Sequence, residues 1–105
     1  MKRRSFLSAC LIAATAMVVA PVTTPATQRS ADQIYQSFCG ACHGTGWNGA
    51  PISGIENDWT PRLGNGVDAM LANVKQGLNT MPPMGTCNDC SDAELKAAIE
   101  FMLKF

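Results

Sequence analysis

The sequence lacks most of the residue sets on which enzyme active sites depend. Its 105 residues contain one histidine, and no carboxylate pair, nucleophile–base set or phosphate-binding loop stands out. This scarcity argues against an independent enzyme. Lysine and arginine form no basic stripe, which argues against nucleic acid as a partner. No stretch alternates apolar and polar residues as a strand would, so the chain is expected to be helical.

Long apolar runs are also missing except near the start of the chain, where one run is too short to span a membrane. That run, Phe6 to Ala20, follows a basic stretch, Lys2 to Arg4, and precedes the small residues Thr24 to Ala26. The pattern predicts a secretory signal peptide over residues 1–26, cleaved after Ala26. An exported, periplasmic domain over residues 27–105 would remain.

The predicted domain is small. Apolar burial alone would leave its 79 residues marginally stable, so a covalent staple or a bound cofactor is expected. Five basic against eight acidic side chains give it a formal charge of −3. Four of the five cysteines form two C-x-x-C pairs within the domain. The fifth, Cys10, ends a stretch resembling a lipid-attachment motif, but most of the apolar run follows it, so we interpret it as an ordinary leader residue.

Cys39, Cys42 and His43 form a C-x-x-C-H motif, the pattern for covalent attachment of a c-type haem. Two thiols three positions apart on a helical turn can each bond one of the two haem vinyl groups, and the next residue can supply the proximal imidazole. The same cysteine pair also resembles a thioredoxin-type redox pair, half of a zinc site or a plain disulfide. A thioredoxin-type enzyme would need a βαβ scaffold, and this chain shows no strand pattern for one.

Three helices joined by glycine-rich loops are expected. The first runs from Ala31 into the C-x-x-C-H motif, and apolar residues at helical spacing predict a second over residues 67–78. The third begins at Ser91, because Ser91 and Glu94 match a capping box. Residues 44–54 and 79–88 are expected to be loops, and residues 56–66 irregular with one helical turn.

Four methionines could supply a sixth ligand to an iron held by His43, and methionine favours ferrous iron. Met70 and Met102 fall on apolar helical stripes, where packing explains them. Met81 and Met84 lie in a loop that two prolines stiffen, and a rigid loop can present sulfur at little entropic cost.

The order of these features resembles that of a class I c-type cytochrome, and more closely the cytochrome c5 group of bacterial monohaem carriers. The resemblance extends through nearly all of residues 27–105, and it implies an all-α fold of three main helices and glycine-rich loops around one covalently bound haem c. The matching segments are Cys39-Gly40-Ala41-Cys42-His43, Gly49-Ala50-Pro51, Trp59-Thr60-Pro61-Arg62, Gly77-Leu78-Asn79-Thr80-Met81-Pro82-Pro83, Gly85-Thr86-Cys87 and Cys90-Ser91.

The resemblance implies roles for four residues outside the motif. Met81 would be the second axial ligand, with Met84 as its rival, and the Pro51 carbonyl would accept the proton on the outer nitrogen of His43. Trp59 and Arg62 would donate to a haem propionate. The last three roles have simpler alternatives, in which Pro51 is a turn residue, Trp59 a core residue and Arg62 a surface residue.

Cys87 and Cys90 have four interpretations: a second haem site, half of a zinc site, a redox-active pair or a structural disulfide. Ser91 follows Cys90 where a haem site needs histidine, and the gap between the two pairs exceeds zinc-ribbon spacing. The resemblance and the oxidising compartment imply a disulfide, which would fix the segment between Met81 and Ser91.

The leading hypothesis is therefore a small soluble electron carrier, not an enzyme, that shuttles one electron between Fe(III) and Fe(II) in a respiratory chain. The expected partners are membrane-bound oxidases, reductases or other cytochromes, met by a monomer or weak dimer. A haem-based gas or redox sensor with an open iron site, and a thiol–disulfide oxidoreductase using Cys39 and Cys42, are the alternatives.

Overall fold

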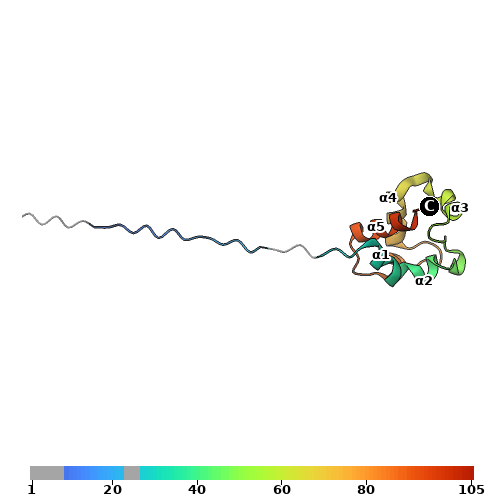
Figure 1. The fold of residues 1–105 in the computed structure, drawn as a ribbon, viewed down its shortest axis with the longest axis horizontal. Coiled ribbons are helices and arrows are strands. Elements are labelled where there is room, and N and C mark those ends of the chain that lie inside the picture. The colour runs from blue at the N-terminus through green and yellow to red at the C-terminus, as the bar shows by residue number, and fades with distance from the viewer. Residues whose placement is uncertain (1–8, 23–26) are drawn as a thin grey trace, which may run out of the picture.

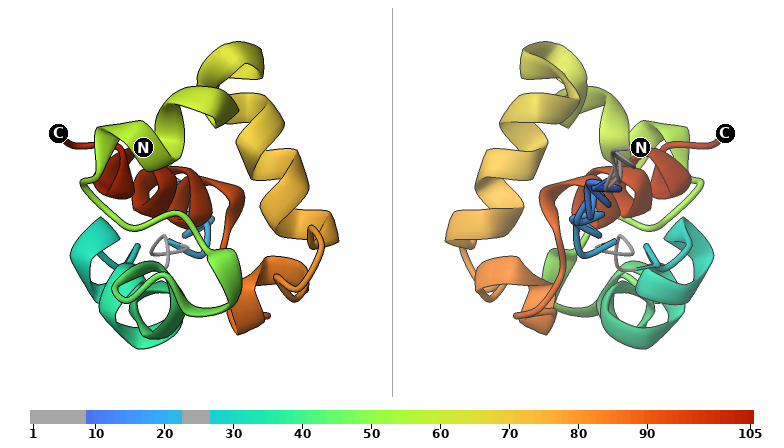
Figure 2. Two further views of the ribbon diagram at one scale, coloured as in Figure 1. Left: turned by 90° about the vertical axis from the view of Figure 1, so that its right-hand side faces the viewer. Right: turned by 90° about the vertical axis from the view of Figure 1, so that its left-hand side faces the viewer.

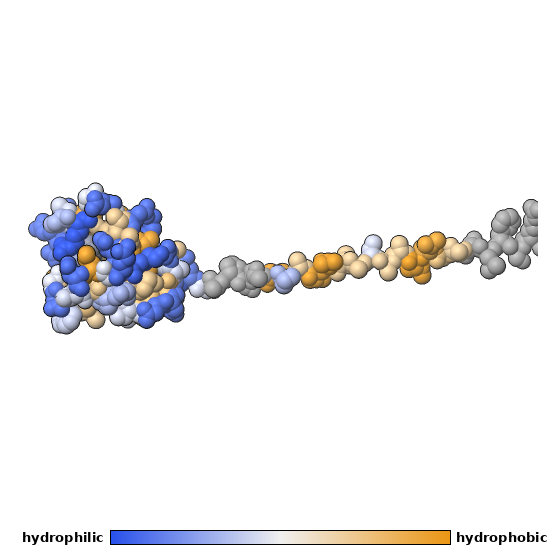
Figure 3. Space-filling view, turned by 180° about the vertical axis from the view of Figure 1, so that it is seen from behind, coloured by the Kyte–Doolittle hydropathy of each residue, from blue (hydrophilic) through white to orange (hydrophobic). Residues whose placement is uncertain are grey.

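The computed structural model describes residues 9–22 and 27–105. Residues 9–22 adopt no helix or strand and are exposed (Figure 1). Figure 3 shows apolar residues along this segment and, on the visible face of the helical part, hydrophilic residues with smaller apolar areas among them. The basic residues 2–4 and the predicted cleavage bond after Ala26 lie outside the described residues. Within the described ranges, no helix has the length and apolar character that crossing a membrane requires.

The predicted first helix is present but changes its winding on the way to the cysteines. It comprises α1 (Ala31–Ile34), a π-helical turn η1 (Tyr35–Cys39) and α2 (Gly40–His43). Ser30 caps it, since the Gln33 amide donates to the Ser30 hydroxyl and the Ser30 amide to the Gln33 side chain. This capping box was not among the features predicted from the sequence. The wide turn ends at Cys39, the first cysteine of the motif, and π-turns often mark functional positions.

The middle of the chain is built from short turns, as expected for residues 44–66. It contains the 3₁₀ turn η2 (Trp47–Gly49), the single helical turn α3 (Glu56–Trp59) and a second 3₁₀ segment, η3 (Thr60–Asn65). The long helix α4 (Gly66–Gln76) follows and ends before Gly77. Leu78, which was expected to continue this helix, instead pairs with Met81 in an isolated β-bridge.

The third helix, α5 (Asp92–Met102), confirms the prediction from its start signal. The Glu94 amide donates to the Ser91 hydroxyl at 3.1 Å, and the Ser91 amide donates to the Glu94 carboxylate at 3.0 Å. The helix packs against α1 and α4, and Figure 2 shows it (red) crossing the fold between them. Its buried face contributes to two apolar clusters. The first consists of Ile34, Cys87, Cys90, Leu95 and Ala98. The second consists of Trp59, Met70, Ile99 and Met102. The described residues contain no strand, so the all-α fold is confirmed.

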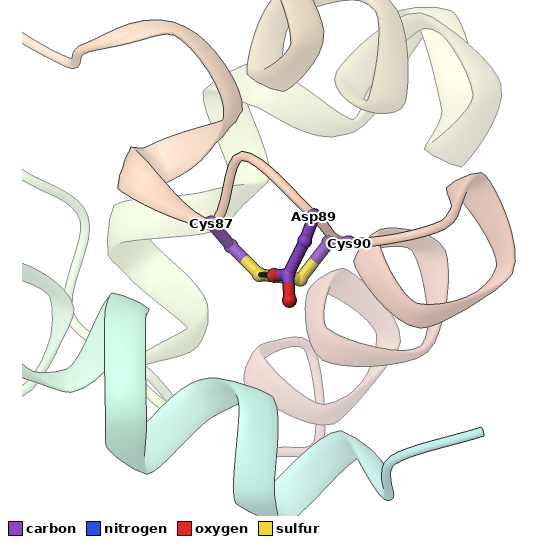
Figure 4. A group of neighbouring side chains, drawn as sticks. All are labelled: Cys87, Asp89 and Cys90. Carbon is purple, nitrogen blue, oxygen red and sulfur yellow. Dashed lines mark hydrogen bonds between the residues drawn. A yellow bond between two sulfur atoms is a disulfide. The ribbon is translucent and has the colours of Figure 1, made fainter. Parts of the chain in front are cut away.

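Arg29 ties the start of the helical part to the cysteine loop before α5. Its Nε lies 2.7 Å from a Glu94 carboxylate oxygen, and one terminal nitrogen lies 3.2 Å from Asp89 and 3.7 Å from the Cys90 sulfur. Cys87 and Cys90 are joined by a disulfide, and the Asp89 side chain lies beside its two sulfurs (Figure 4). The Arg29 guanidinium therefore links the two carboxylates and the disulfide, all of which lie about 60 residues away in sequence.

This network generates a prediction about acid stability. The Arg29 guanidinium, together with the Ser91 amide, lowers the pKa of the Glu94 carboxyl from 4.5 to about 2. A lowered folded-state pKa adds stability that is present above the unfolded value and is lost as the pH falls through the folded one. The melting temperature should therefore decline between about pH 4.5 and pH 2. In Glu94→Gln it should be lower at pH 7 and flatter across that window, as followed by circular dichroism.

The exposed Glu100 on the same helix provides the matched control. Glu100→Gln should keep the pH dependence of the natural protein. A Glu94→Gln variant with an unchanged acid profile would show that the ion pair does not stabilise the fold.

Candidate functional site

His43 ends α2 with its ring buried, 8% of the residue being exposed. Its Nδ1 lies 2.8 Å from the Pro51 carbonyl oxygen. A carbonyl oxygen can only accept, so Nδ1 carries the proton and Nε2 keeps its lone pair for a metal. The Ser53 amide donates to the His43 carbonyl at 2.7 Å, so a second hydrogen bond joins His43 to the loop that contains Pro51. The loop thus fixes both the tautomer and the position of the imidazole.

Trp59 takes a different position from the one that the resemblance implied. Its ring lies against His43, with centroids 5.8 Å apart and planes 24° from parallel. Its indole N–H donates to the Ile52 carbonyl at 2.8 Å. An indole has one N–H, so Trp59 has no donor left for a propionate in this arrangement. Trp59 instead covers the histidine and anchors the loop. This position matches the alternative in which Trp59 is a core residue.

Arg62 is exposed at the edge of the site. One of its terminal nitrogens donates to the backbone carbonyl of Asp58. A guanidinium has five N–H donors, so most remain free for a carboxylate. Arg62 therefore keeps the chemistry that a propionate contact requires.

Cys39 and Cys42 both have free sulfurs, half-buried on the turn before His43. Burial, with a smaller contribution from Cys42, raises the pKa of the Cys39 thiol to about 11. Catalytic thiols of redox enzymes have a lowered pKa instead. The Cys39 thiol is thus unsuited to attack a disulfide at neutral pH, whereas the spacing of the pair suits two thioether bonds.

A cavity of about 410 Å³ lies in front of His43. Cys42, Trp59, Arg62 and Met81 also line it, together with apolar side chains from α4 and α5, while Cys39 packs beside it in the core. Pockets of this size and apolar character hold drug-sized or larger ligands. Two free thiols, an imidazole with a free Nε2 and an apolar wall together fit a covalently bound haem.

Met81 lines this cavity, and the backbone holds it there. The Met81 amide donates to the Leu78 carbonyl at 2.8 Å, and the Leu78 amide donates back to the Met81 carbonyl at 3.1 Å. Gly77 permits this tight turn, since its φ is +82° and a β-carbon there would lie 2.9 Å from the Met81 carbonyl oxygen. Met84 does not line the cavity and packs against the cluster around the disulfide.

The second cysteine pair lies apart from the cavity. Cys87, Asp89 and Cys90 come together closely enough to suggest a metal site. Their two sulfurs, however, are bonded to each other, and a metal needs thiolates. The structure thus has the disulfide that the resemblance implied.

Two contributors at the site were missed by the sequence analysis. Ile52 supplies the carbonyl that anchors Trp59, and its amide donates to the Asp58 carboxylate at 3.0 Å. Neither contact leaves a pattern in the sequence, because each depends on how the loop meets α3.

The fold and the site define a class I monohaem c-type cytochrome, and comparisons with known proteins agree. A family model described as cytochrome c oxidase, cbb3-type, subunit III matches residues 26–102. Cytochrome c5 of Azotobacter vinelandii is 52% identical over 73 residues, covering 68% of this chain and 88% of that protein. Cytochrome c5 of Ectopseudomonas mendocina is 50% identical over 76 residues, covering 70% and 87%.

Solved structures show the same likeness. A mono-haem ferrocytochrome c from Shewanella putrefaciens is 52% identical, with a TM-score of 0.68, and the match covers 75% of this chain and 98% of that one. A chain from an electron transfer complex of nitrite reductase with cytochrome c is 37% identical, with a TM-score of 0.66, covering 73% and 95%. This chain therefore belongs to the monohaem c-type cytochromes, carries one covalently bound haem c and is a small electron carrier.

Covalent attachment at the two motif cysteines predicts the result of an extraction. Acid–acetone treatment of the holoprotein should leave the haem colour with the protein, because thioether bonds survive conditions that release ligated haem. A variant with Cys39→Ala and Cys42→Ala should release any colour it holds. The control with Cys87→Ala and Cys90→Ala should retain it, and colour leaving the natural protein with the solvent would refute attachment at these residues.

Proposed function

We propose that this cytochrome is an exported, periplasmic one-electron shuttle of a respiratory chain, in which His43 and Met81 are the axial ligands. The observation that carries the proposal is that both side chains line one cavity, each anchored through the backbone a few residues away. The haem supplies the Fe(III)/Fe(II) couple when bound. Export rests on the leader pattern of residues 1–26.

The chain's own residues would orient the ligands and exclude water. The Pro51 carbonyl holds the proton on Nδ1 of His43, which would leave Nε2 to bind the iron. The Leu78–Met81 bridge presents the thioether, and the buried residues of α4 and α5 provide a low-dielectric wall. Arg62 is proposed to bind a propionate with its remaining N–H donors.

The alternatives receive less support from the same geometry. A gas sensor needs a sixth coordination position on the iron that opens readily, whereas two backbone hydrogen bonds hold Met81 to Leu78. A thiol–disulfide oxidoreductase needs a reactive thiolate, whereas burial raises the pKa of Cys39. With both axial positions filled, substrate has no access to the iron, so we propose no catalytic activity.

Replacing each loop methionine separately tests the ligand assignment. Met81→Ala should lose the long-wavelength sulfur-to-ferric-iron band and lower the reduction potential, because ferrous iron loses its preferred ligand. Met84→Ala should keep the band and show only a lower melting temperature, because Met84 packs in the core. The assignment would be wrong if Met81→Ala kept the band or if Met84→Ala alone abolished it.

The proposed partners are redox proteins such as membrane-bound oxidases, reductases or other cytochromes. A structural neighbour was solved in an electron transfer complex with nitrite reductase, which supports this class. At the cavity edge Trp47 is 61% exposed and Leu78 is 50% exposed. Among the described residues lining the cavity, only Arg62 is charged. A small, apolar and rapidly reversible contact suits this surface.

Electron transfer to such a partner should therefore depend weakly on ionic strength. Trp47→Ser should slow the bimolecular rate several-fold at every salt concentration, because it removes an apolar contact. Ile55→Ser is the control, since Ile55 is also exposed but does not line the cavity, and it should leave the rate unchanged. A steep fall in the rate with added salt in stopped-flow measurements would instead identify charge steering as the main determinant.

A further inference from the structure

One peptide group, between Pro51 and Ile52, contacts two functional partners at once. Its carbonyl oxygen accepts from Nδ1 of His43 at 2.8 Å. Its amide donates to the Asp58 carboxylate at 3.0 Å. The carboxylate, the peptide group and the imidazole therefore form one continuous hydrogen-bonded chain. We propose that Asp58 is a positioning residue that sets the reduction potential by acting on the histidine ligand through this peptide.

The physical basis is polarisation along the chain of hydrogen bonds. A negative charge at the amide end draws the N–H dipole toward it and leaves more electron density on the carbonyl oxygen. That oxygen then accepts more strongly from Nδ1, and the imidazole becomes a more electron-rich ligand at Nε2. A richer ligand, like the nearby negative charge itself, stabilises ferric iron more than ferrous iron. Asp58 should therefore lower the potential.

The surroundings of Asp58 leave its charge available for this role. The side chain is half-buried, and among the described residues no ion pair includes it. Arg62, its neighbour one turn later, donates to the Asp58 backbone carbonyl, not to the carboxylate as an ion pair. The indole of Trp59 holds the Ile52 carbonyl at 2.8 Å, so the next peptide along is fixed from the same helical turn, α3. The geometry therefore couples α3 to His43 without direct contact between Asp58 and the ring.

Asp58→Asn in the holoprotein separates the charge from the shape. Asparagine keeps an oxygen of the same reach for the Ile52 amide but loses the negative charge. At a fixed solution potential the ratio of reduced to oxidised protein should rise about threefold, or about 28 mV at 59 mV per tenfold. Asp58→Glu keeps the charge and should stay near the natural ratio. An unchanged ratio in Asp58→Asn would overturn the proposal.

Glu56 on the same turn, α3, is the matched control. Its side chain is exposed and makes no hydrogen bond to the loop of Pro51 and Ile52. Glu56→Gln removes the same charge two residues away and should change the ratio by less than half as much. Equal changes in the two variants would show that only the general field of the protein acts, and the peptide chain would be rejected.

A second measurement follows the hydrogen bond itself. In the reduced, diamagnetic holoprotein, the Nδ1 proton resonance of His43 should move upfield in Asp58→Asn, as a weaker hydrogen bond requires, and remain in place in Glu56→Gln. No movement in Asp58→Asn would contradict the proposal. If Asp58→Asn does not take up haem, exchange of the Ile52 amide in the natural protein decides. Slow exchange supports the contact with Asp58, and exchange as fast as in an open loop overturns it.

The inference rests on the proposed role of His43 as a ligand, and the experiment distinguishes the two failures. A natural holoprotein without a low-spin spectrum would refute the assignment of His43 as a ligand. A low-spin natural protein, and an Asp58→Asn variant with the same spectrum and the same potential, would refute only the role of Asp58.

Discussion

The hydrogen bond between Nδ1 of His43 and the Pro51 carbonyl is the contact on which the site depends. It decides which imidazole nitrogen carries a proton, and so which one can bind iron. For the bond to form, the chain must reverse within a few residues, and the glycine-rich loop makes this reversal. The amide of Ser53 and the indole of Trp59 then hold the returning loop segment in place. The motif cysteines, the loop and α3 thus form one unit.

The features that local chemistry dictates were predictable from the sequence. The spacing of Cys39, Cys42 and His43 predicts the attachment site because the chemistry itself needs that spacing. The capping box of Ser91 and Glu94 marks the start of α5 to the residue, since both halves of the signal lie within four positions. The same signature at Ser30 was available and was missed.

The features that depend on tertiary contacts could not be predicted. Arg29 meets Glu94 across 65 positions, and no local pattern indicates that pairing. The indole of Trp59 bonds to a backbone carbonyl, which any residue at position 52 would offer. Leu78 fits the apolar stripe of α4, yet the helix ends before Gly77 and Leu78 pairs with Met81. The positive φ of Gly77 permits this closer turn.

The small closed turn from Leu78 to Met81 has a consequence for the speed of electron exchange. A metal centre transfers electrons quickly when its bond lengths and surroundings need little rearrangement between the two oxidation states. Here the two backbone bonds of Met81, and the close approach of Gly77 behind them, leave the residue little room to shift. The surrounding dipoles are likewise set before the electron arrives, so they need not reorient during the transfer. With Met81 as the proposed ligand, the rigidity of this four-residue turn would lower the reorganisation energy.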